Sequence, residues 1–183
     1  ASSTSGRRSC SLAWTNSAGC LAWHSAPSHG FTGVNHLALN VFQASDFSGS
    51  VAGPGGTRTI PAREFFVDYL QTALAPDEVL TEIRVPKLTG WGVHYEKFQR
   101  VAQAWAVVGV AAAVRSSNGS IAEARIGLTN MAPTPVRASA VEQALAGGDR
   151  TRDAITAAAA AAADGTAPTS DLSAQADYRE HLA

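Results

Sequence analysis

Hydrophobic and polar residues alternate most regularly between residues 79 and 128. Residues 79–85 place Val, Thr, Ile and Val in alternation with Leu, Glu and Arg, which predicts a strand that stops at Pro86. Residues 93–115 begin with polar and apolar side chains in alternation and continue as a nearly uncharged Val/Ala/Gly run. We therefore expect a polar, aromatic strand there, followed by a buried one.

A further strand is expected at residues 121–128, where Ile126 and Leu128 share one face. Asn118-Gly119 lies between this strand and the buried one before it, and is a strong hairpin signal. Asn118-Gly119-Ser120 also has the pattern of a glycosylation acceptor, but without a secretion signal the turn is favoured. This strand and the two within residues 93–115 are therefore expected to form an antiparallel meander.

A helix is expected directly after the meander. Thr134-Pro135 has the form of an N-cap followed by proline at the first helical position. Val141, Ala144 and Leu145 would form the apolar stripe of this helix, and Gly147-Gly148 would end it.

Two further helices are expected in the remaining chain. Asp149 or Thr151 can cap the first of these, which would continue through the alanines 157–163 to Gly165 because alanine has the highest helix propensity. Ser173 can cap the second, which would carry Tyr178. Strands followed by about three helices predict an α+β fold, with the helices on one face of the antiparallel meander.

The chain before the meander is expected to contain a turn and one more helix. Residues 52–58 are rich in glycine and proline, and a hairpin turn is favoured over a phosphate loop because no Lys-Ser/Thr follows. Pro61 suits the first position of a helix whose apolar face would include Phe65, Phe66 and Tyr69. Pro76 would end that helix.

Composition limits the classes of partner. The 183 residues include 14 basic and 15 acidic side chains, so the net charge of -1 gives no electrostatic case for nucleic acid or a membrane surface. No run of 18 apolar residues predicts a transmembrane segment, and no apolar region follows Arg7 and Arg8 to form a signal peptide. A cytoplasmic location is therefore expected. The chain does not start with Met, which indicates a partial sequence.

Residues 1–48 differ from the remainder. They have no charged side chain between Arg8 and Asp46 and no persistent hydrophobic period, so we expect a weakly packed, out-of-frame or unrelated segment. Three histidines occur here, but their spacing fits no helical face and no metal site is expected; they are His24, His29 and His36. Cys10 and Cys20 could form a disulfide, although reduced thiols are favoured without a secretory signal.

No catalytic motif is present. The chain has no Gly-x-Ser-x-Gly, no His-Glu-x-x-His and no Cys-x-x-Cys, so no catalytic residue is assigned. On spacing alone, Lys97 and Arg100 are solvated residues at a strand edge, and Tyr95 and Trp105 are core or interface aromatics.

Several motifs in order carry a family resemblance. They are Val-Ala-Gly-Pro-Gly-Gly at 51–56 with Thr-Ile-Pro-Ala at 59–62 and Phe65-Phe66, residues 74–86, residues 95–98 with 106–111 and 130–138, and residues 170–172 with 177–179. Through them, residues 51–183 resemble the flavoprotein (medium) subunit of molybdenum hydroxylases, most closely the carbon monoxide dehydrogenase type. The resemblance implies that residues 49–86 are the tail of an FAD-binding α+β domain and residues 87–183 the flavoprotein C-terminal domain.

The resemblance also implies a cofactor and partners. In the family, FAD lies between these domains and accepts electrons from an iron–sulfur small subunit. That subunit receives them from a molybdopterin large subunit. By position, Tyr95 is similar to the aromatic residue against the flavin ring, Leu80 to an apolar contact and Lys97 to a basic residue near the flavin. A flat ring needs an apolar wall, and a nearby cation stabilises the reduced, anionic flavin.

Residues 1–48 depart from the family pattern. They contain neither of the two glycine-rich loops that contact the FAD pyrophosphate in the family, so tight FAD binding by this chain alone is not expected. Two functions therefore remain open. One is an FAD-subunit fragment of a molybdenum hydroxylase, and the other is a non-catalytic docking module that packs on partner subunits without cofactor.

Overall fold

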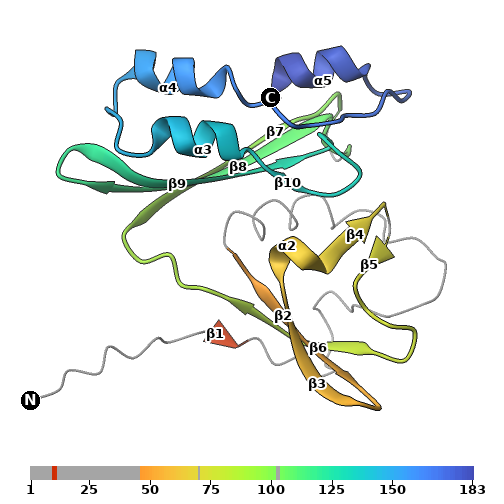
Figure 1. Ribbon diagram of the computed structural model, residues 1–183. Helices are drawn as coiled ribbons and strands as arrows, with labels where there is room; N and C mark the ends of the chain where they lie inside the picture. The colour runs from red at the N-terminus through yellow and green to blue at the C-terminus, as the bar shows by residue number, and fades with distance from the viewer. Residues whose placement is uncertain (1–9, 12–45, 70, 102–103) are drawn as a thin grey trace, which may run out of the picture.

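The computed structural model describes residues 10–11, 46–69, 71–101 and 104–183. It contains two four-stranded sheets, β1-β6-β2-β3 and β10-β9-β8-β7, and a small two-stranded sheet (Figure 1). All neighbouring strands are antiparallel. Three helices cover one face of the second sheet, and the first sheet lies on its other side (Figure 1). The expected α+β class is confirmed.

The second sheet contains the predicted meander. Strands β7 (Trp91–Phe98), β8 (Val108–Ser117) and β9 (Ser120–Thr129) follow one another in the chain and in space. Asn118 and Gly119 form the turn between β8 and β9, with φ angles of 50° and 84°. These left-handed angles are those that Asn-Gly hairpin turns require, so the turn prediction is confirmed. A short fourth strand, β10 (Val136–Arg137), pairs with β9.

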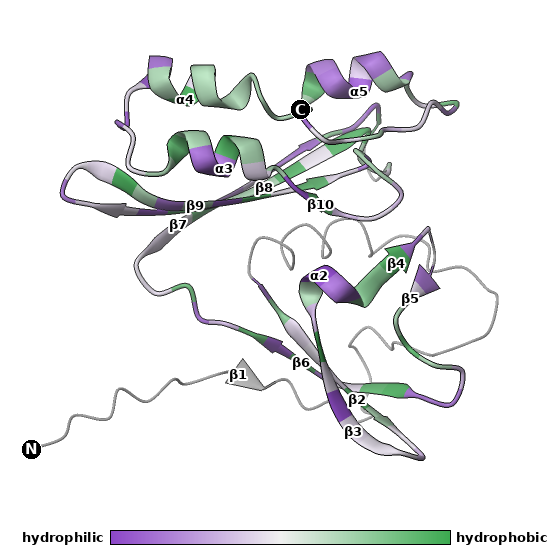
Figure 2. Ribbon diagram, viewed as in Figure 1, coloured by the Kyte–Doolittle hydropathy of each residue, from purple (hydrophilic) through white to green (hydrophobic). Residues whose placement is uncertain are grey.

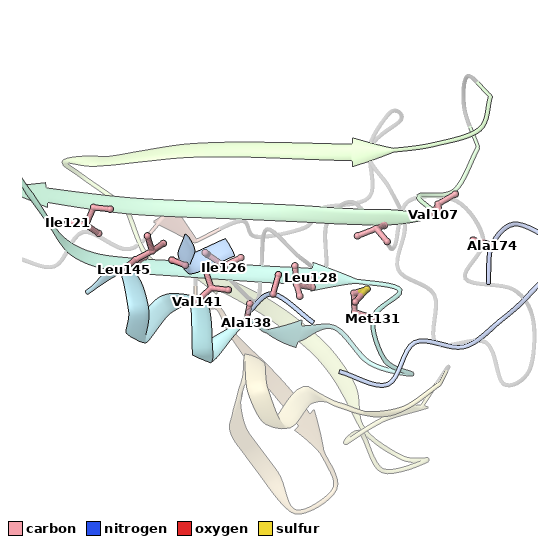
Figure 3. Packing of buried hydrophobic residues seen from close by; sticks show 13 residues of the cluster. Val107, Ile121, Ile126, Leu128, Met131, Ala138, Val141, Leu145 and Ala174 are labelled. Carbon is pink, nitrogen blue, oxygen red and sulfur yellow. The ribbon is translucent and has the colours of Figure 1, made fainter. Parts of the chain in front are cut away.

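The three helices of the second half are α3 (Ser139–Leu145), α4 (Arg152–Ala159) and α5 (Ala176–Leu182). Figure 2 shows hydrophobic and hydrophilic residues in turn along α3, as expected for a helix with one buried face. The core between helices and sheet takes side chains from β8, β9, α3, α4 and the segments that connect them (Figure 3). It includes Val108, Ile121, Ile126, Leu128, Met131, Ala138, Val141, Leu145, Ala158, Ala162 and Ala174.

The first of these helices starts later than predicted. Thr134-Pro135 does not open it, because Val136 and Arg137 instead pair with Leu128 and Gly127 of β9. The backbone N–H of Ala138 continues this pairing with a 2.9 Å hydrogen bond to the carbonyl of Ile126. Pairing with the sheet therefore outweighs the local capping signal, and the helix begins at Ser139.

The ends of the other two helices depart from prediction in different ways. Thr151 is confirmed as the N-cap of α4, since its side chain accepts a hydrogen bond from Ala154 N. The alanine run does not stay helical to Gly165; after Ala159 it continues as turns with i→i+3 hydrogen bonds. Ser173 does not cap α5, because its N–H donates to the Asp171 carboxylate and Gln175 takes the cap position.

The first sheet is smaller and has its own core. Its strands are β1 (Cys10–Ser11), β2 (Ser48–Gly53), β3 (Gly56–Pro61) and β6 (Val79–Val85). Pro54 and Gly55 connect β2 to β3, which confirms the hairpin, and β6 has the bounds expected from its alternation. The core residues are Phe47, Val51, Ile60, Ala62 and Phe65.

The helix predicted from Pro61 towards Pro76 is wrong beyond its first turn. Helix α2 covers only Ala62–Phe65, and the chain continues as strands β4 (Phe66–Asp68) and β5 (Gln71–Thr72). Phe65 is 1% exposed and Tyr69 is 64% exposed, so they do not share a buried helical face. The small core encloses Phe65, partly buried Phe66 packs against it, and a cross-strand pairing of Phe66 with Thr72 replaces the next helical turn.

The described residues bear on two sequence expectations, no metal site and no transmembrane segment. Within the described residues, no group of three or more His, Cys, Asp or Glu side chains is placed to hold a metal ion. His24, His29, His36 and Cys20 lie outside the described residues. No helix in the described part of the chain is both long enough and apolar enough to cross a membrane.

Candidate functional site

The two faces of the second sheet differ in side-chain size. Val108 and Val110 of β8 pack into the core beneath the helices. Because side chains alternate along a strand, Gly109, Ala111 and Ala113 belong to the opposite face. Gly127 of β9 lies opposite Ala111 and extends this face of small residues. The sheet therefore presents a floor of glycine and alanine on the side away from the helices, which we call the small-residue face.

Tyr95 belongs to the small-residue face. It is a half-buried residue of β7 and pairs with Ala111. Its hydroxyl is buried and has no hydrogen-bond partner among the described residues. Burial raises the pKa of the Tyr95 hydroxyl above its ordinary value of 10.0, so the group is protonated at neutral pH and needs a partner as donor or acceptor.

Lys97 lies two residues further along β7, on the same face and opposite Gly109. Its ammonium Nζ donates a 2.7 Å hydrogen bond to the carbonyl of Ala104, in the connection between β7 and β8. The backbone of this connection therefore holds the lysine charge close to the sheet. The structure thus brings Tyr95 and Lys97 together, as their spacing requires.

Leu80 lies in a different sheet. It belongs to β6, pairs with Val51 and packs against the core of the first sheet. Its Cδ1 lies only 2.8 Å from where a Cβ on Gly49 would be, so Leu80 occupies the space that this glycine leaves open. The structure therefore gives Leu80 a packing role in the first core, and its contact with a flavin stays a prediction.

A charged cluster on the small-residue face was missed by sequence reasoning. The guanidinium of Arg125 lies 4.7 Å from the ring centre of Trp91, and that of Arg115 lies 5.7 Å from it. Glu123 joins the two arginines through contacts of 3.0 Å and 2.9 Å. Burial opposes ionisation of Glu123, but hydrogen bonds and charge from both arginines still lower its pKa. The alternation of Glu123 and Arg125 along β9 was the available signal.

The ending Asp171 with Tyr178-Arg179, which contributed to the family resemblance, has a structural role. Arg179 is 2% exposed and its guanidinium donates to the carbonyls of Val107 and Thr169. It also pairs with the Asp171 carboxylate at 2.7 Å. Desolvation opposes ionisation of Asp171, but backbone N–H donors and Arg179 lower the pKa of its carboxyl below 3.8. This arginine therefore ties α5 to the start of β8.

Comparisons with known proteins agree with this architecture. Residues 93–183 match the family model described as the CO dehydrogenase flavoprotein C-terminal domain. The chain is 40% identical over 158 residues to the carbon monoxide dehydrogenase medium chain of Hydrogenophaga pseudoflava, a match that covers 85% of this chain and 54% of that protein. It is 38% identical over 134 residues to the medium chain from Afipia carboxidovorans, which covers 73% of this chain and 46% of that protein.

Solved structures give the same result. The carbon monoxide dehydrogenase structure from Hydrogenophaga pseudoflava, which lacks the Mo-pyranopterin moiety of the molybdenum cofactor, matches with a TM-score of 0.75 and 41% identity. That match covers 79% of this chain and 50% of that one, and the chain spans about half the length of the curated relatives it matches.

The sequence match to the Hydrogenophaga pseudoflava protein, at 85% of the chain, is longer than residues 49–183 alone can supply. Part of it therefore lies upstream of residue 49, in the segment where the sequence on its own suggested no relationship. Three findings indicate the same family: the matched C-terminal domain, the similarity to medium chains and the shared fold. The chain belongs to the flavoprotein (medium) subunit family of molybdenum hydroxylases, of the carbon monoxide dehydrogenase type.

Proposed function

We propose that the chain acts as the FAD-carrying component of a molybdenum hydroxylase such as carbon monoxide dehydrogenase, and relays electrons from iron–sulfur clusters to an acceptor. The observation that carries this proposal is Tyr95, which lies inside the matched flavoprotein domain with its ring half-buried and its hydroxyl buried without a partner among the described residues. When bound, FAD supplies a ring system that accepts and passes on electrons.

The residues present fit a flavin. The half-buried ring of Tyr95 offers an aromatic surface, which favours stacking with a flat ring. The carbonyl oxygens and ring nitrogens of a flavin are acceptors that its orphaned hydroxyl could use. Lys97 on the same face supplies a cation whose position is held by the Ala104 carbonyl. We propose Tyr95 and Lys97 as flavin-binding residues of this chain.

Partners are part of the same proposal. Several of the relatives are named as medium chains or medium subunits, including the nicotine 6-hydroxylase medium subunit of Paenarthrobacter nicotinovorans, which is 30% identical. We propose that this chain assembles with an iron–sulfur small subunit and a molybdopterin large subunit. A cytoplasmic location belongs to the proposal and can be tested by cell fractionation.

We also propose a domain boundary between residues 86 and 87. Strand β6 pairs within the first sheet and β7 within the second, and residues 86–90 connect them. The family model begins at residue 93, just after this connection. Residues 49–86 would then be the end of an FAD-binding domain and residues 87–183 the flavoprotein C-terminal domain.

The test is flavin content in an assembled complex. The chain would be co-expressed with the small and large subunits of the Hydrogenophaga pseudoflava enzyme, whose medium chain is 40% identical, and purified through a tag on the large subunit. We expect the chain to co-purify with FAD in about equal amount. Tyr95→Ala should weaken FAD binding by roughly two- to tenfold, the contribution of one aromatic contact.

Tyr69→Ala is the matched control, because Tyr69 is 64% exposed and belongs to the other half of the chain. It should leave the FAD content unchanged. Co-purification of the wild-type chain without FAD would instead support the docking module that binds no cofactor. A chain that neither co-purifies nor gains thermal stability with FAD would contradict both functions.

A further inference from the structure

Asp46 connects the two sheets. It lies two residues before β2 of the first sheet, and its carboxylate forms ion pairs with Arg125 of β9 at 2.8 Å and with Arg137 of β10 at 3.0 Å. One carboxylate therefore receives two guanidinium groups from neighbouring strands of the second sheet. Asp46 has a φ of 52°, so its backbone lies in the left-handed region that few non-glycine residues adopt.

On the first sheet, Asp46 is fixed through its neighbour. Phe47 is 3% exposed, and its ring packs edge-on against Phe65 at 5.9 Å in the core of the first sheet. The carbonyl of Phe47 accepts a 2.9 Å hydrogen bond from Ala62 N at the start of α2. A shift of the Asp46 backbone would therefore require a shift of the first core.

On the second sheet, both arginines are held in place without Asp46. Arg137 contacts the Glu142 carboxylate of α3 at 2.6 Å and 2.9 Å. Glu142 is fixed in turn, because its Oε1 accepts a 2.7 Å hydrogen bond from Ile126 N. Arg125 contacts Glu123 at 2.9 Å and stacks on Trp91. Both cations therefore present a preformed site to an incoming carboxylate.

Among the described residues, the cores of the two sheets share no member, so each sheet is stabilised mainly from within. We propose that Asp46 is an ion-pair lock that fixes the first sheet against the face of the second sheet that carries Tyr95. The Asp46 side chain is 55% exposed, so salt screens the two ion pairs. The lock is thus reversible: it sets the orientation of the two sheets at low ionic strength and loosens as salt rises. It acts without FAD.

The test is hydrogen exchange measured by mass spectrometry on the full chain without cofactor. The reporter is the connection between the sheets, where Trp91 N donates a 3.2 Å hydrogen bond to the carbonyl of Leu88. At about 10 mM salt, where charges act over ~30 Å, Asp46→Asn should exchange at this site about threefold faster than wild type or more. Glu64→Gln is the matched control, since it removes one negative charge from an exposed pair within α2.

A salt series tests the lock without any variant. At about 1 M salt, where the screening length is ~3 Å, wild type should exchange at the Trp91 amide as fast as Asp46→Asn. Equal rates for wild type, Asp46→Asn and Glu64→Gln at low salt would overturn the proposal. Faster exchange throughout residues 108–129 in Asp46→Asn would also overturn it, because Asp46 would then stabilise the second sheet itself and not its orientation.

Discussion

Truncation of Arg179 to alanine should destabilise the second half of the chain more than any other single change at a charged residue. The side chain is 2% exposed, and its guanidinium is shared among the carbonyls of Val107 and Thr169 and the carboxylate of Asp171. These groups come from the start of β8 and the loop before α5. The truncation therefore removes one side chain that joins three segments of the chain.

The magnitude follows from what each partner loses. Val107 is 2% exposed, and leaving its buried carbonyl without a donor costs about 1–3 kcal/mol. Alanine also lacks two buried methylenes of the arginine stem, at about 0.8 kcal/mol each. Thr169 is exposed and the Asp171 side chain is 54% exposed, so water can replace their contacts and their loss costs at most about 1 kcal/mol. The expected destabilisation is about 3–5 kcal/mol.

Thermal unfolding followed by circular dichroism measures this effect. For a chain of this size each kcal/mol lowers Tm by about 2–4 °C, so Arg179→Ala should lower it by roughly 10 °C. Arg179→Met keeps an unbranched apolar stem in place of the arginine methylenes. Its Tm should therefore fall less than that of Arg179→Ala, by the share that burial of the methylenes contributes. Asp171→Asn should cost less than Arg179→Ala, because the Asp171 side chain is 54% exposed and asparagine keeps an oxygen that can accept from Arg179. If Arg179→Ala were no more destabilising than Asp171→Asn, the buried carbonyl of Val107 would not need its donor and the reasoning would be wrong.

Three further changes test other parts of the fold. Leu128→Ala, at a fully buried core position, should cost about 2–5 kcal/mol in urea unfolding. Thr151→Ala removes the N-cap of α4 and should lower stability by about 1 kcal/mol in the same assay. The hydrogen bonds from Arg58 and from the N–H of Ala75 lower the pKa of Glu78 from 4.5 to about 2, so its stabilising contribution is complete above pH 4.5 and is lost as the pH falls towards 2. Glu78→Gln should therefore lower the urea midpoint at pH 7, with the difference from wild type shrinking by pH 3.

Local signals predicted the elements whose geometry is decided locally. The turn at Asn118-Gly119 was predictable because few other residue pairs adopt two successive left-handed conformations. Strand β6 kept its expected bounds because Pro86 cannot continue the ladder. Thr151 capped α4 because its hydroxyl needs only an N–H within the same turn. In each case the deciding contact lies within a few residues along the chain.

The missed features depend on contacts between distant residues. Thr134-Pro135 has the form of a helix start, but Val136 and Arg137 find partners on β9 that local sequence cannot indicate. Phe65 and Phe66 fit one helical face equally well until the size of the first core is known. In the candidate site, the sequence located Tyr95 and Lys97 on one strand, since a spacing of two fixes a shared face.

The partner of Lys97 in the β7–β8 connection could not be predicted, and neither could the convergence of Arg125 and Arg137 on Asp46. Asp46 is 91 residues from Arg137 along the chain, so only the folded arrangement of the two sheets brings the charges together. Long-range ion pairs of this kind leave no periodic trace in a single sequence.

The unequal faces of β8 set opposite limits on how its sequence can vary. On the helix side, Val108 is 2% exposed within the core, so a smaller side chain leaves a void. On the other side, Ala111 and Ala113 are 2% and 0% exposed, so a larger side chain has no room to enter. A substitution scan along this strand should therefore show opposite tolerance on the two faces: small replacements fail at Val108, whereas large replacements fail at Ala111 and Ala113.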